Sequence, residues 1–293
     1  MCDAARLRAP TEDERVETCY APTGLDPFSE MGRDRFLVRR SAQVMRAIRR
    51  ALAALALLLT ALRPALAADV ISYAPLDSVL ALDVRDGRVD YGALARDRGP
   101  LTRLLATAYG ADPERFSREA QIAFWVNVYN ARVLDGVARR PGLRSVLDVG
   151  KAVGVPTLGF FHERAVVAGR DLSLDDIEHQ ILRASFHEPR LHFVLNCASA
   201  SCPKLPAHAL HAASLDSTLD AAAAAFLADP ARNRITPGGE LQLSSIFKWY
   251  RGDFEAAAGS LPAFLARHWK GAPLRGDEPI HFLAYDWSLN GHW

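Results

Sequence analysis

Residues 191–203, LHFVLNCASASCP, bring two thiols close together in the sequence. Cys197 and Cys202 are separated by four small residues, and Pro203 follows directly. Because proline suits the first position of a helix, Cys202 is predicted to be the N-cap of a helix that begins at Pro203. Free backbone N–H groups and the positive end of the helix dipole favour a thiolate there. We therefore interpret Cys202 as the candidate reactive cysteine.

The apolar run at 191–196 has the character of a β-strand. Alternation along a strand places His192 and Asn196 on one face and Cys197 on the other. We therefore expect His192 and Asn196 to face a pocket and Cys197 to point into packing.

Three interpretations of the cysteine pair are open. In the first, Cys197 and Cys202 form a structural disulfide. An oxidising compartment would favour this bond, and the four small residues between the cysteines allow a tight loop.

In the second interpretation, Cys202 is a catalytic nucleophile with His192 or His179 as the base and Glu178 as the residue that orients the base. Amide side chains would then donate hydrogen bonds to an oxyanion. The candidate amides are Asn127, Asn130 and Asn196. This pattern predicts a cysteine-dependent hydrolase or acyl transferase that acts on an amide or thioester-like bond.

In the third interpretation, Cys197, Cys202, His192 and His179 bind a metal ion. The Cys-x4-Cys spacing is at the long end of zinc sites, and the histidines lack a helical H-x3-H arrangement, so the pattern favours this interpretation least. We expect no metal and no cofactor.

Glu178 is predicted to lie in the middle of the apolar stripe of a helix at 173–186, which Ser173 caps. A buried carboxylate without a partner is costly. We therefore expect either that an arginine such as Arg183 or Arg190 neutralises Glu178, or that Glu178 belongs to a pocket.

Other polar residues are open to a structural and a functional interpretation. Asn127 and Asn130 share one face of the most apolar predicted helix, where they either tie down loop backbone or line a pocket. Near the C-terminus, Tyr285 and Asp286 are candidate binding residues. Asp286 either orients a histidine or caps a neighbouring helix, and Trp287 is expected to fill the core.

The elements that carry these residues do not alternate in a βαβ rhythm. In chain order we expect a helical stretch from 112, a central buried helix at 123–137, a strand around 166–167, helices at 173–186 and 216–227, a strand at 191–196, a short strand after 237–239, a helix at 244–258 and a strand at 281–290. The pattern predicts an α+β fold, a single domain with helices packed on a small mixed or antiparallel sheet.

The N-terminal part of the sequence contains a pattern typical of a secretory signal peptide. Three arginines, an apolar stretch and an Ala-Leu-Ala cleavage signal follow one another within residues 45–67. The apolar stretch is too short to predict a membrane span. The expected organisation is an untranslated or disordered extension at 1–44, a signal peptide at 45–67, a lead-in at 68–88 and one globular domain at 89–290.

The composition narrows the class of partner. The chain carries 35 Lys and Arg against 34 Asp and Glu, which gives a formal net charge of +1. This balance gives no reason to expect nucleic acid as a partner. We expect a small-molecule or peptide ligand, no stable membrane span after signal cleavage, and a periplasmic or secreted location.

Five sequence blocks occur in a characteristic order: QIAFWVNVYNA, SLDDIEHQILR, LHFVLNCASASCPKL, IFKWYRGDF and YDWSLN. With them the chain resembles the domain of unknown function 547 family from about Val89 to Asn290. The resemblance implies an exported bacterial domain with plant and animal relatives, and it supplies no reaction. The characteristic positions are Phe124, Trp125, Asn127, Tyr129, Asn130, Glu178, His179, Arg183, His192, Asn196, Cys197, Cys202, Pro203, Asp253, Tyr285, Asp286, Trp287 and Asn290.

The resulting hypothesis is an exported protein in which Glu178, His192, Asn127 and the Cys202 sulfur surround one cavity. The alternative class is a non-enzymatic envelope protein that binds a ligand or a partner over a disulfide-closed loop.

The signal-peptide pattern makes a direct prediction about the mature protein. We expect it to begin at Ala68 or Asp69, because the cleavage signal ends at Ala67. N-terminal sequencing of the purified protein tests this. Recovery of residues 1–44 on stable protein would contradict it.

Overall fold

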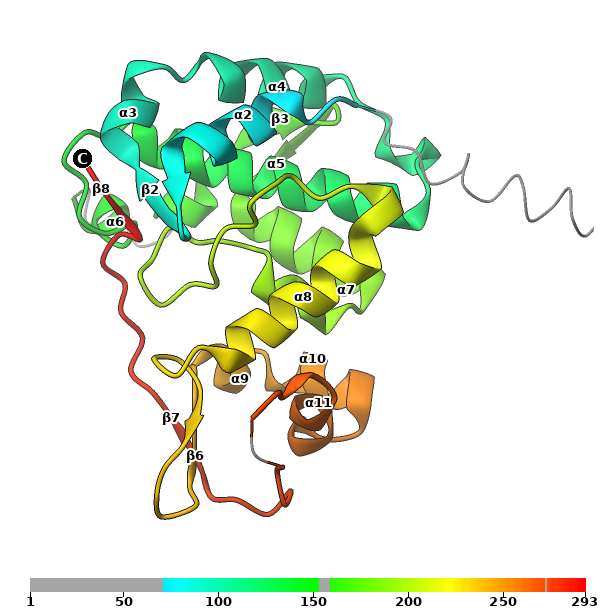
Figure 1. The fold of residues 1–293 in the computed structure, drawn as a ribbon. Coiled ribbons are helices and arrows are strands. Elements are labelled where there is room, and N and C mark those ends of the chain that lie inside the picture. The colour runs from blue at the N-terminus through cyan, green and yellow to red at the C-terminus, as the bar shows by residue number, and fades with distance from the viewer. Residues whose placement is uncertain (1–70, 153–158, 272) are drawn as a thin grey trace, which may run out of the picture. The chain divides into compact units, whose positions relative to one another are not determined.

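A long helix, α5 (Arg118–Ala138), lies among α2 (Ala74–Asp83), α3 (Tyr91–Arg96), α4 (Gly99–Tyr109) and the segments that follow it (Figure 1). The Ser117 side chain caps it by accepting a hydrogen bond from the Ala120 N–H, and Glu119 in the first turn suits the helix dipole. Ala120 and every residue from Ile122 to Ala138 are buried. The prediction of a central buried helix is therefore confirmed.

The computed structural model describes residues 71–152, 159–271 and 273–293. The expected extension at 1–44 and the expected signal peptide at 45–67 lie outside the described residues. Within the described part, no helix is both long enough and apolar enough to cross a membrane.

Most other elements are short helices. They are α2 (Ala74–Asp83), α3 (Tyr91–Arg96), α4 (Gly99–Tyr109), α6 (Asp148–Ala152), the π-helix η4 (Asp176–Arg183), α7 (Ala184–Phe186), α8 (Leu215–Ala228), α9 (Ile246–Trp249), α10 (Arg251–Ala258) and α11 (Leu261–His268). Single turns of 3-10 helix are η1 (Pro113–Arg115), η3 (Phe160–His162), η5 (Pro189–Phe193) and η6 (Ala212–Ser214). The strands are β1 (Val84–Arg85), β2 (Arg88–Asp90), β3 (Ala165–Val167), β4 (Arg170–Leu172), β5 (Arg234–Ile235), β6 (Leu241–Leu243), β7 (Ile280–Phe282) and β8 (Gly291–His292).

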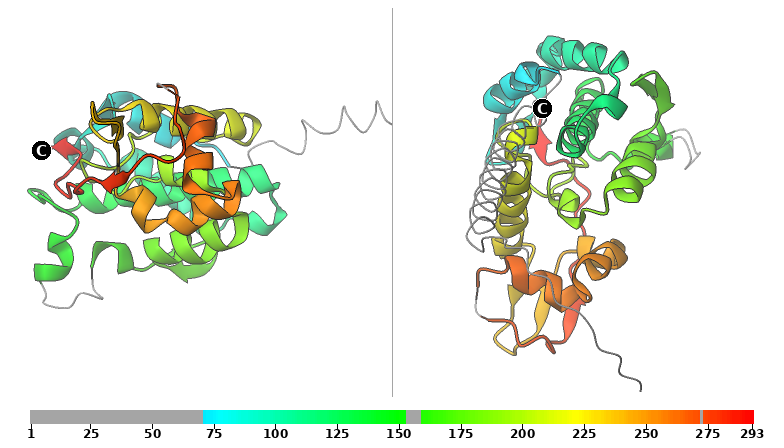
Figure 2. Two further views of the ribbon diagram at one scale, coloured as in Figure 1. Left: turned by 90° about the horizontal axis from the view of Figure 1, so that it is seen from below. Right: turned by 90° about the vertical axis from the view of Figure 1, so that its right-hand side faces the viewer.

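Two apolar clusters stabilise these elements. In the first, α4 packs on α5 and α2 packs on α4, with Leu76 and Leu104 among the buried side chains. The second joins η5 and α8 to the elements from β6 to α11, which lie at the opposite end from α2 in Figure 1 and in the right-hand view of Figure 2. Its buried aromatic residues are Phe193, Phe226, Phe247, Phe254 and Phe264.

The strands form three small sheets, in the orders β1-β2-β8, β3-β4 and β5-β6-β7. The pairs β2–β8 and β6–β7 are parallel, and the others are antiparallel. The C-terminal segment runs from β7 to β8 and so connects two of the sheets (Figure 1). The predicted α+β class is confirmed, although the strands form three separate sheets where one was expected.

The strand predicted at 191–196 is wrong, because this segment contains the 3-10 turn η5. Pro189 has a fixed φ that suits a helical start, and the Glu188 side chain caps the turn by accepting from the Arg190 N–H. All six residues of 191–196 are buried. A run that is buried on every side has no polar face, so its alternation carried no information about orientation.

The helix predicted to begin at Pro203 is also wrong, because residues 203–206 form no helix. Pro206 disfavours helical backbone at Leu205, since its ring clashes with the preceding residue. Cys202 is therefore not the N-cap of a helix, and no helix dipole acts on its sulfur.

Two further predictions need correction. The helix predicted at 244–258 is divided into α9 and α10, which meet at Tyr250. The strand predicted at 281–290 is limited to β7 and β8 at its margins, and the segment between them hydrogen-bonds to residues 198–201 instead. The helix predicted at 216–227 and the strands predicted around 166–167 and after 237–239 are confirmed as α8, β3 and β6.

Candidate active site or ligand pocket

A cavity of about 400 Å³ lies where η4, η5, α9 and the C-terminal segment meet. Its walls include Glu178, His192, Tyr250 and both sulfur-bearing residues, Cys197 and Cys202. These residues are far apart in the sequence, and the fold brings them to one place. Of the four residues expected around one cavity, Glu178, His192 and Cys202 line it, whereas Asn127 does not.

Glu178 contributes a buried carboxylate to this cavity, with 8% of the residue exposed. It lies on η4, whose start is a capping box in which Ser173 and Asp176 bond each other's N–H groups. The Glu178 oxygens accept hydrogen bonds from two tyrosines: Tyr250 OH lies 2.6 Å from Oε1, and Tyr129 OH lies 3.3 Å from Oε2.

The two tyrosines are held in the protonated, donating form. Burial, followed by the nearby charge of Glu178, raises the pKa of the Tyr129 hydroxyl well above its usual range. The same causes in the same order raise the pKa of Tyr250. Both hydroxyls are therefore donors to the carboxylate at any physiological pH.

The arginine expected beside Glu178 is elsewhere. Arg183 pairs with Asp253, and Arg190 pairs with Glu188 on the far side of η5. Among the described residues, no lysine, arginine or histidine forms an ion pair with Glu178. The prediction of neutralisation by Arg183 or Arg190 is wrong, because hydroxyl donors satisfy this carboxylate instead.

His192 belongs to a polar chain that runs along the cavity wall. Its ring stacks on that of Tyr250 with centroids 3.8 Å apart, and its Nε2 lies 2.8 Å from Asp253 Oδ2. Arg183 donates two hydrogen bonds to the same carboxylate, at 2.7 Å and 2.9 Å. The residue that orients His192 is therefore Asp253, where the sequence suggested Glu178.

The charge of Asp253 is stabilised by these contacts. Burial alone would raise the pKa of its carboxyl, but the hydrogen bonds from His192 and Arg183 outweigh burial and hold this pKa below its usual range. Asp253 is therefore ionised at neutral pH, with two partners fixed around it.

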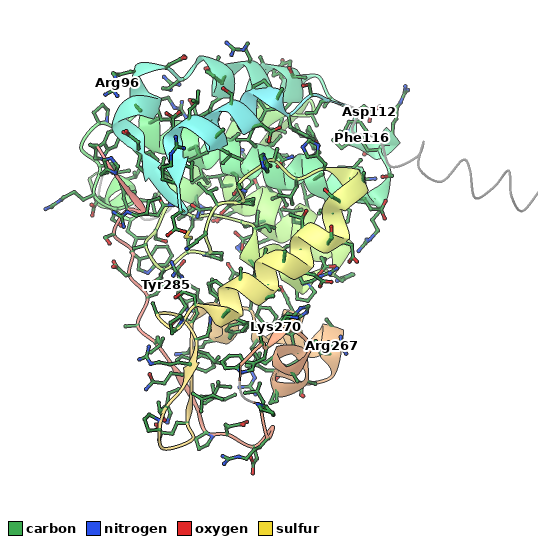
Figure 3. All side chains as sticks on the ribbon, viewed as in Figure 1. Arg96, Asp112, Phe116, Arg267, Lys270 and Tyr285 are labelled. Carbon is green, nitrogen blue, oxygen red and sulfur yellow. A yellow bond between two sulfur atoms is a disulfide. The ribbon has the colours of Figure 1, made fainter. Side chains whose placement is uncertain are left out.

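Aromatic side chains form another part of the wall. Trp249, Tyr285 and Trp287 contact one another, with ring centroids 4.7 to 5.8 Å apart. Tyr285 lies on the segment between β7 and β8 (Figure 3). Trp249 is 46% exposed, so it forms the rim of the cavity, and Trp287 lines the wall instead of filling the core.

Cys197 and Cys202 form a disulfide, with Cα atoms 6.3 Å apart. This agrees with the first of the three interpretations. Cys202 is 4% exposed, whereas Cys197 is partly exposed on the cavity wall. Cys197 was expected to point into packing and instead lines the cavity, because the strand from which its orientation was deduced is absent.

The comparisons with known proteins add a family. Residues 113–227 match the family model described as "Protein of unknown function, DUF547". The chain carries a DUF547 domain. The resemblance inferred from the sequence blocks is thereby confirmed. No match was found among curated proteins or among solved structures.

The matched part of the DUF547 domain includes Glu178, His192 and the disulfide, whereas Tyr250 and Asp253 follow it in the sequence. The cavity is thus completed by residues beyond the matched range. Glu178 and His192 lie within the matched range, whereas the hydroxyl donor Tyr250 and the hydrogen-bond partner Asp253 lie beyond it.

The three candidate asparagines do not line the cavity. Asn127 exchanges hydrogen bonds with the backbone of Leu210, at 2.8 Å and 2.9 Å. Asn130 accepts from the Asn196 N–H, and the Asn196 side chain donates to the Pro203 carbonyl oxygen. These amides hold loops in place, so their predicted role as donors to an oxyanion is wrong.

The other predicted site residues divide between the cavity and the surface. His179 and Tyr285 line the cavity. Asp286 is exposed, and its carboxylate accepts hydrogen bonds from Ser288, so it caps its own turn and orients no histidine. Across the described residues, no three His, Cys, Asp or Glu side chains are arranged to hold a metal ion.

Sequence reasoning missed the roles of Tyr129 and Tyr250. Tyr129 lies in a helix that is buried on all sides, where a phenol hydroxyl has to find a partner inside the protein. This signal could have indicated that a polar group faces α5. The partner itself comes from η4, and no local pattern identifies it.

The environment of Glu178 makes a prediction about stability. Glu178→Gln keeps the shape and one acceptor oxygen and should cost about 1 kcal/mol, whereas Glu178→Ala leaves a cavity and two orphaned hydroxyls and should cost about 2–4 kcal/mol. Urea denaturation gives both free energies of unfolding. The exposed Glu114→Gln serves as the matched control. Equal, negligible losses for both Glu178 variants would show that Glu178 is solvated.

The low pKa of Asp253 makes a prediction about pH. A carboxyl whose folded pKa lies below its unfolded value of about 3.9 stabilises the fold above that pH and loses this effect as the pH falls. Asp253→Asn should therefore cost on the order of 2 kcal/mol at pH 7 and clearly less below pH 3. Denaturation of both proteins across this pH range measures the difference, with the exposed Asp277→Asn as control. A cost that does not change with pH would contradict the proposed ion pairing.

Proposed function

We propose that this DUF547 domain binds a small molecule that carries a protonated amine. In this proposal the amine lies against the Glu178 carboxylate, and the rest of the ligand lies against the aromatic wall formed by Trp249, Tyr285 and Trp287. The ligand is thus a small amine of the kind that a cavity of about 400 Å³ can hold.

The observation that carries this proposal is the buried Glu178 carboxylate on the cavity wall, which forms no ion pair with any described residue. Arg183 also lines the cavity, but its guanidinium pairs with Asp253. Each Glu178 oxygen accepts one hydrogen bond from a tyrosine and can accept a second. Burial of an ionised carboxylate is costly unless an opposite charge compensates it. A ligand ammonium group would provide both the charge and the additional hydrogen bonds.

The aromatic wall supports the same class of ligand. A cation is attracted to the face of an aromatic ring, most strongly to tryptophan. Trp249 and Trp287 lie with ring centroids 5.8 Å apart on the cavity wall. Indole rings also provide apolar surface for the uncharged part of the ligand.

A cysteine-dependent hydrolase or acyl transferase is the competing proposal. The observation that favours it is that His192 lines the same cavity as the two cysteines. It requires a free thiol, and both sulfurs take part in the disulfide. We therefore favour the binding protein, for which the disulfide is compatible with the function.

We also propose a periplasmic or secreted location. The signal-peptide pattern at 45–67 supports it, and disulfides persist in oxidising compartments.

Calorimetry with simple alkylammonium ions and the alcohols of matching size tests the proposed function. We expect the ammonium ions to bind and the alcohols to bind more weakly. Glu178→Gln should weaken ammonium binding by about 30-fold, because it removes the buried partner of the charge. The surface variant Glu119→Gln should bind like the wild type.

Equal binding of ammonium ions and alcohols, or unchanged binding by Glu178→Gln, would contradict the proposal. Treatment of the same unreduced protein with iodoacetamide distinguishes the binding protein from the competing hydrolase. Only the hydrolase needs a free thiol, so selective labelling of Cys202 would favour the hydrolase.

A further inference from the structure

We propose that the Cys197–Cys202 disulfide undergoes thiol–disulfide exchange with a small aminothiol bound in the cavity. This rests on the proposed function, since the amine would lie at Glu178 while the thiol reaches the disulfide on the wall of the same cavity. The proposal adds a covalent activity and a narrower class of ligand.

The two sulfurs differ in their access to the cavity. Cys197 is partly exposed there, whereas Cys202 is 4% exposed. An incoming thiolate has to approach the sulfur that it attacks. Cys197, the more exposed of the two residues, is therefore the proposed site of attack, and the Cys202 sulfur is the leaving group.

Hydrogen-bond donors already surround the leaving sulfur. The Cys197 N–H donates to Cys202 Sγ at 2.9 Å. The Tyr285 hydroxyl lies 3.3 Å from Cys202 Sγ and also 3.3 Å from Cys197 Sγ, so the N–H is the donor that distinguishes the two sulfurs. Such bonds become stronger when the acceptor gains a negative charge. They would stabilise the Cys202 thiolate at the moment when the disulfide breaks.

Tyr285 is suited to this role because it keeps its proton. Burial raises the pKa of the Tyr285 hydroxyl to about 12. The Ser199 hydroxyl donates to the Tyr285 oxygen at 3.4 Å, so the Tyr285 proton is free to point at a sulfur. Ser199 and Tyr285 thus form a short relay that ends at the disulfide.

The loop between the cysteines is held by bonds other than the disulfide. The Ala200 N–H donates to the Ser288 carbonyl oxygen at 2.7 Å, and the Asn290 N–H donates to the Ala198 carbonyl oxygen at 3.0 Å. Ala198 has a φ of 60°, a left-handed conformation that residues with a Cβ rarely adopt. The surrounding hydrogen bonds therefore determine the shape of this loop.

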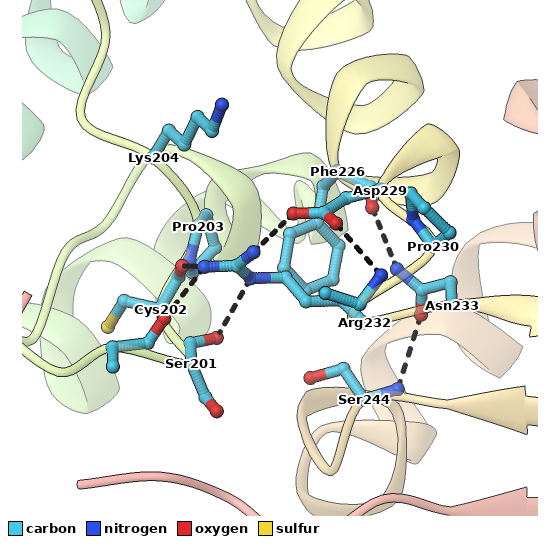
Figure 4. A network of polar contacts seen from close by, with 12 residues as sticks. Ser201, Cys202, Pro203, Lys204, Phe226, Asp229, Pro230, Arg232, Asn233 and Ser244 are labelled. Carbon is cyan, nitrogen blue, oxygen red and sulfur yellow. Dashed lines mark hydrogen bonds and ion pairs between the residues drawn. The ribbon is translucent and has the colours of Figure 1, made fainter. Parts of the chain in front are cut away.

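Arg232 binds the same loop from the other side (Figure 4). Its guanidinium donates to the Ala200 carbonyl oxygen at 2.7 Å and to the Cys202 carbonyl oxygen at 3.0 Å. Asp229 pairs with the guanidinium and fixes its position. The disulfide spans a sequence separation of only 5, for which the effect on chain entropy is smallest. The loop is therefore also held by hydrogen bonds that do not depend on the disulfide.

The proposed step is balanced. The thiolate of the aminothiol attacks Cys197 Sγ, a new S–S bond forms, the Cys197–Cys202 bond breaks, and Cys202 leaves as a thiolate. A second molecule of aminothiol attacks the sulfur of the first, which releases Cys197 as a thiolate. In sum, two aminothiols are oxidised to their disulfide, and the protein disulfide is reduced to two thiols.

The test uses the full-length oxidised protein and three thiols that differ in charge: cysteamine, mercaptoethanol and mercaptopropionate. Each rate is divided by the rate of the same thiol with a small linear disulfide, which removes differences in intrinsic reactivity. Mass spectrometry after acid quenching locates the adduct. We expect a mixed disulfide at Cys197, and a normalised rate at least about tenfold higher for cysteamine than for mercaptopropionate.

Two variants separate binding from chemistry. Glu178→Gln should abolish the preference for cysteamine over mercaptopropionate, because it removes the charge that binds the amine. Tyr285→Phe should slow all three thiols alike by about tenfold, because it removes a donor to the leaving sulfur but keeps the ring. Tyr109→Phe on the exposed face of α4 is the matched control and should change nothing.

Failure of the exchange proposal and failure of the proposed function are distinguished by the binding of S-methylcysteamine. This compound has the amine but no reactive thiol. If it binds but cysteamine forms no adduct at Cys197, the exchange proposal is overturned and the proposed function stands. If it does not bind, both are overturned. An adduct on Cys202 would overturn the assigned direction of attack, and unchanged rates in Tyr285→Phe would overturn the role of that hydroxyl.

Discussion

The rest of the structure depends on one constraint, which is that α5 is buried on all of its faces. A polar side chain on such a helix has no access to water and must find its partner inside the protein. Asn127 holds the backbone at Leu210, and Asn130 holds it at Val194. Tyr129 holds Glu178. The polar residues of α5 therefore determine where the surrounding loops lie, and so where the cavity forms.

The cavity combines two kinds of electrostatic environment. Asp253 accepts hydrogen bonds from His192 and from the positively charged Arg183, and is stabilised as an ion. Glu178 accepts hydrogen bonds from tyrosine hydroxyls and forms no ion pair with any described residue. The ring of Tyr250 connects the two carboxylates, since it stacks on His192 while its hydroxyl bonds Glu178. Under the proposed function, a cationic ligand would supply the charge that pairs with Glu178.

The loop between Cys197 and Cys202 is also held in place by contacts from other parts of the chain. Its backbone groups are bound by the C-terminal segment and by Arg232, so its conformation is imposed from outside. These contacts, as well as the bond between the two sulfurs, therefore position the cysteines. A reactive pair requires such a scaffold, because the donors around the leaving sulfur have to be in place before the bond breaks.

The sequence by itself determined the features that depend on local pattern. The apolar run of α5 predicted a central buried helix, Ser173 and Asp176 predicted the start of η4, and the five sequence blocks predicted the DUF547 family. Glu178 was expected to be buried because it interrupts an apolar stripe. These inferences hold since helical periodicity and capping act over a few neighbouring residues.

Only the tertiary structure decided which residues Glu178 and His192 bond and which way Cys197 faces. The run at 191–196 is buried on every side, so alternation could not orient Cys197, and Pro206 disfavours the helix on which the role of Cys202 depended. The tyrosines around Glu178 and the partner of His192 come from elements far apart in the chain. Contacts of this kind are set by how α5, η4 and α9 pack together, and no local pattern of residues encodes that packing.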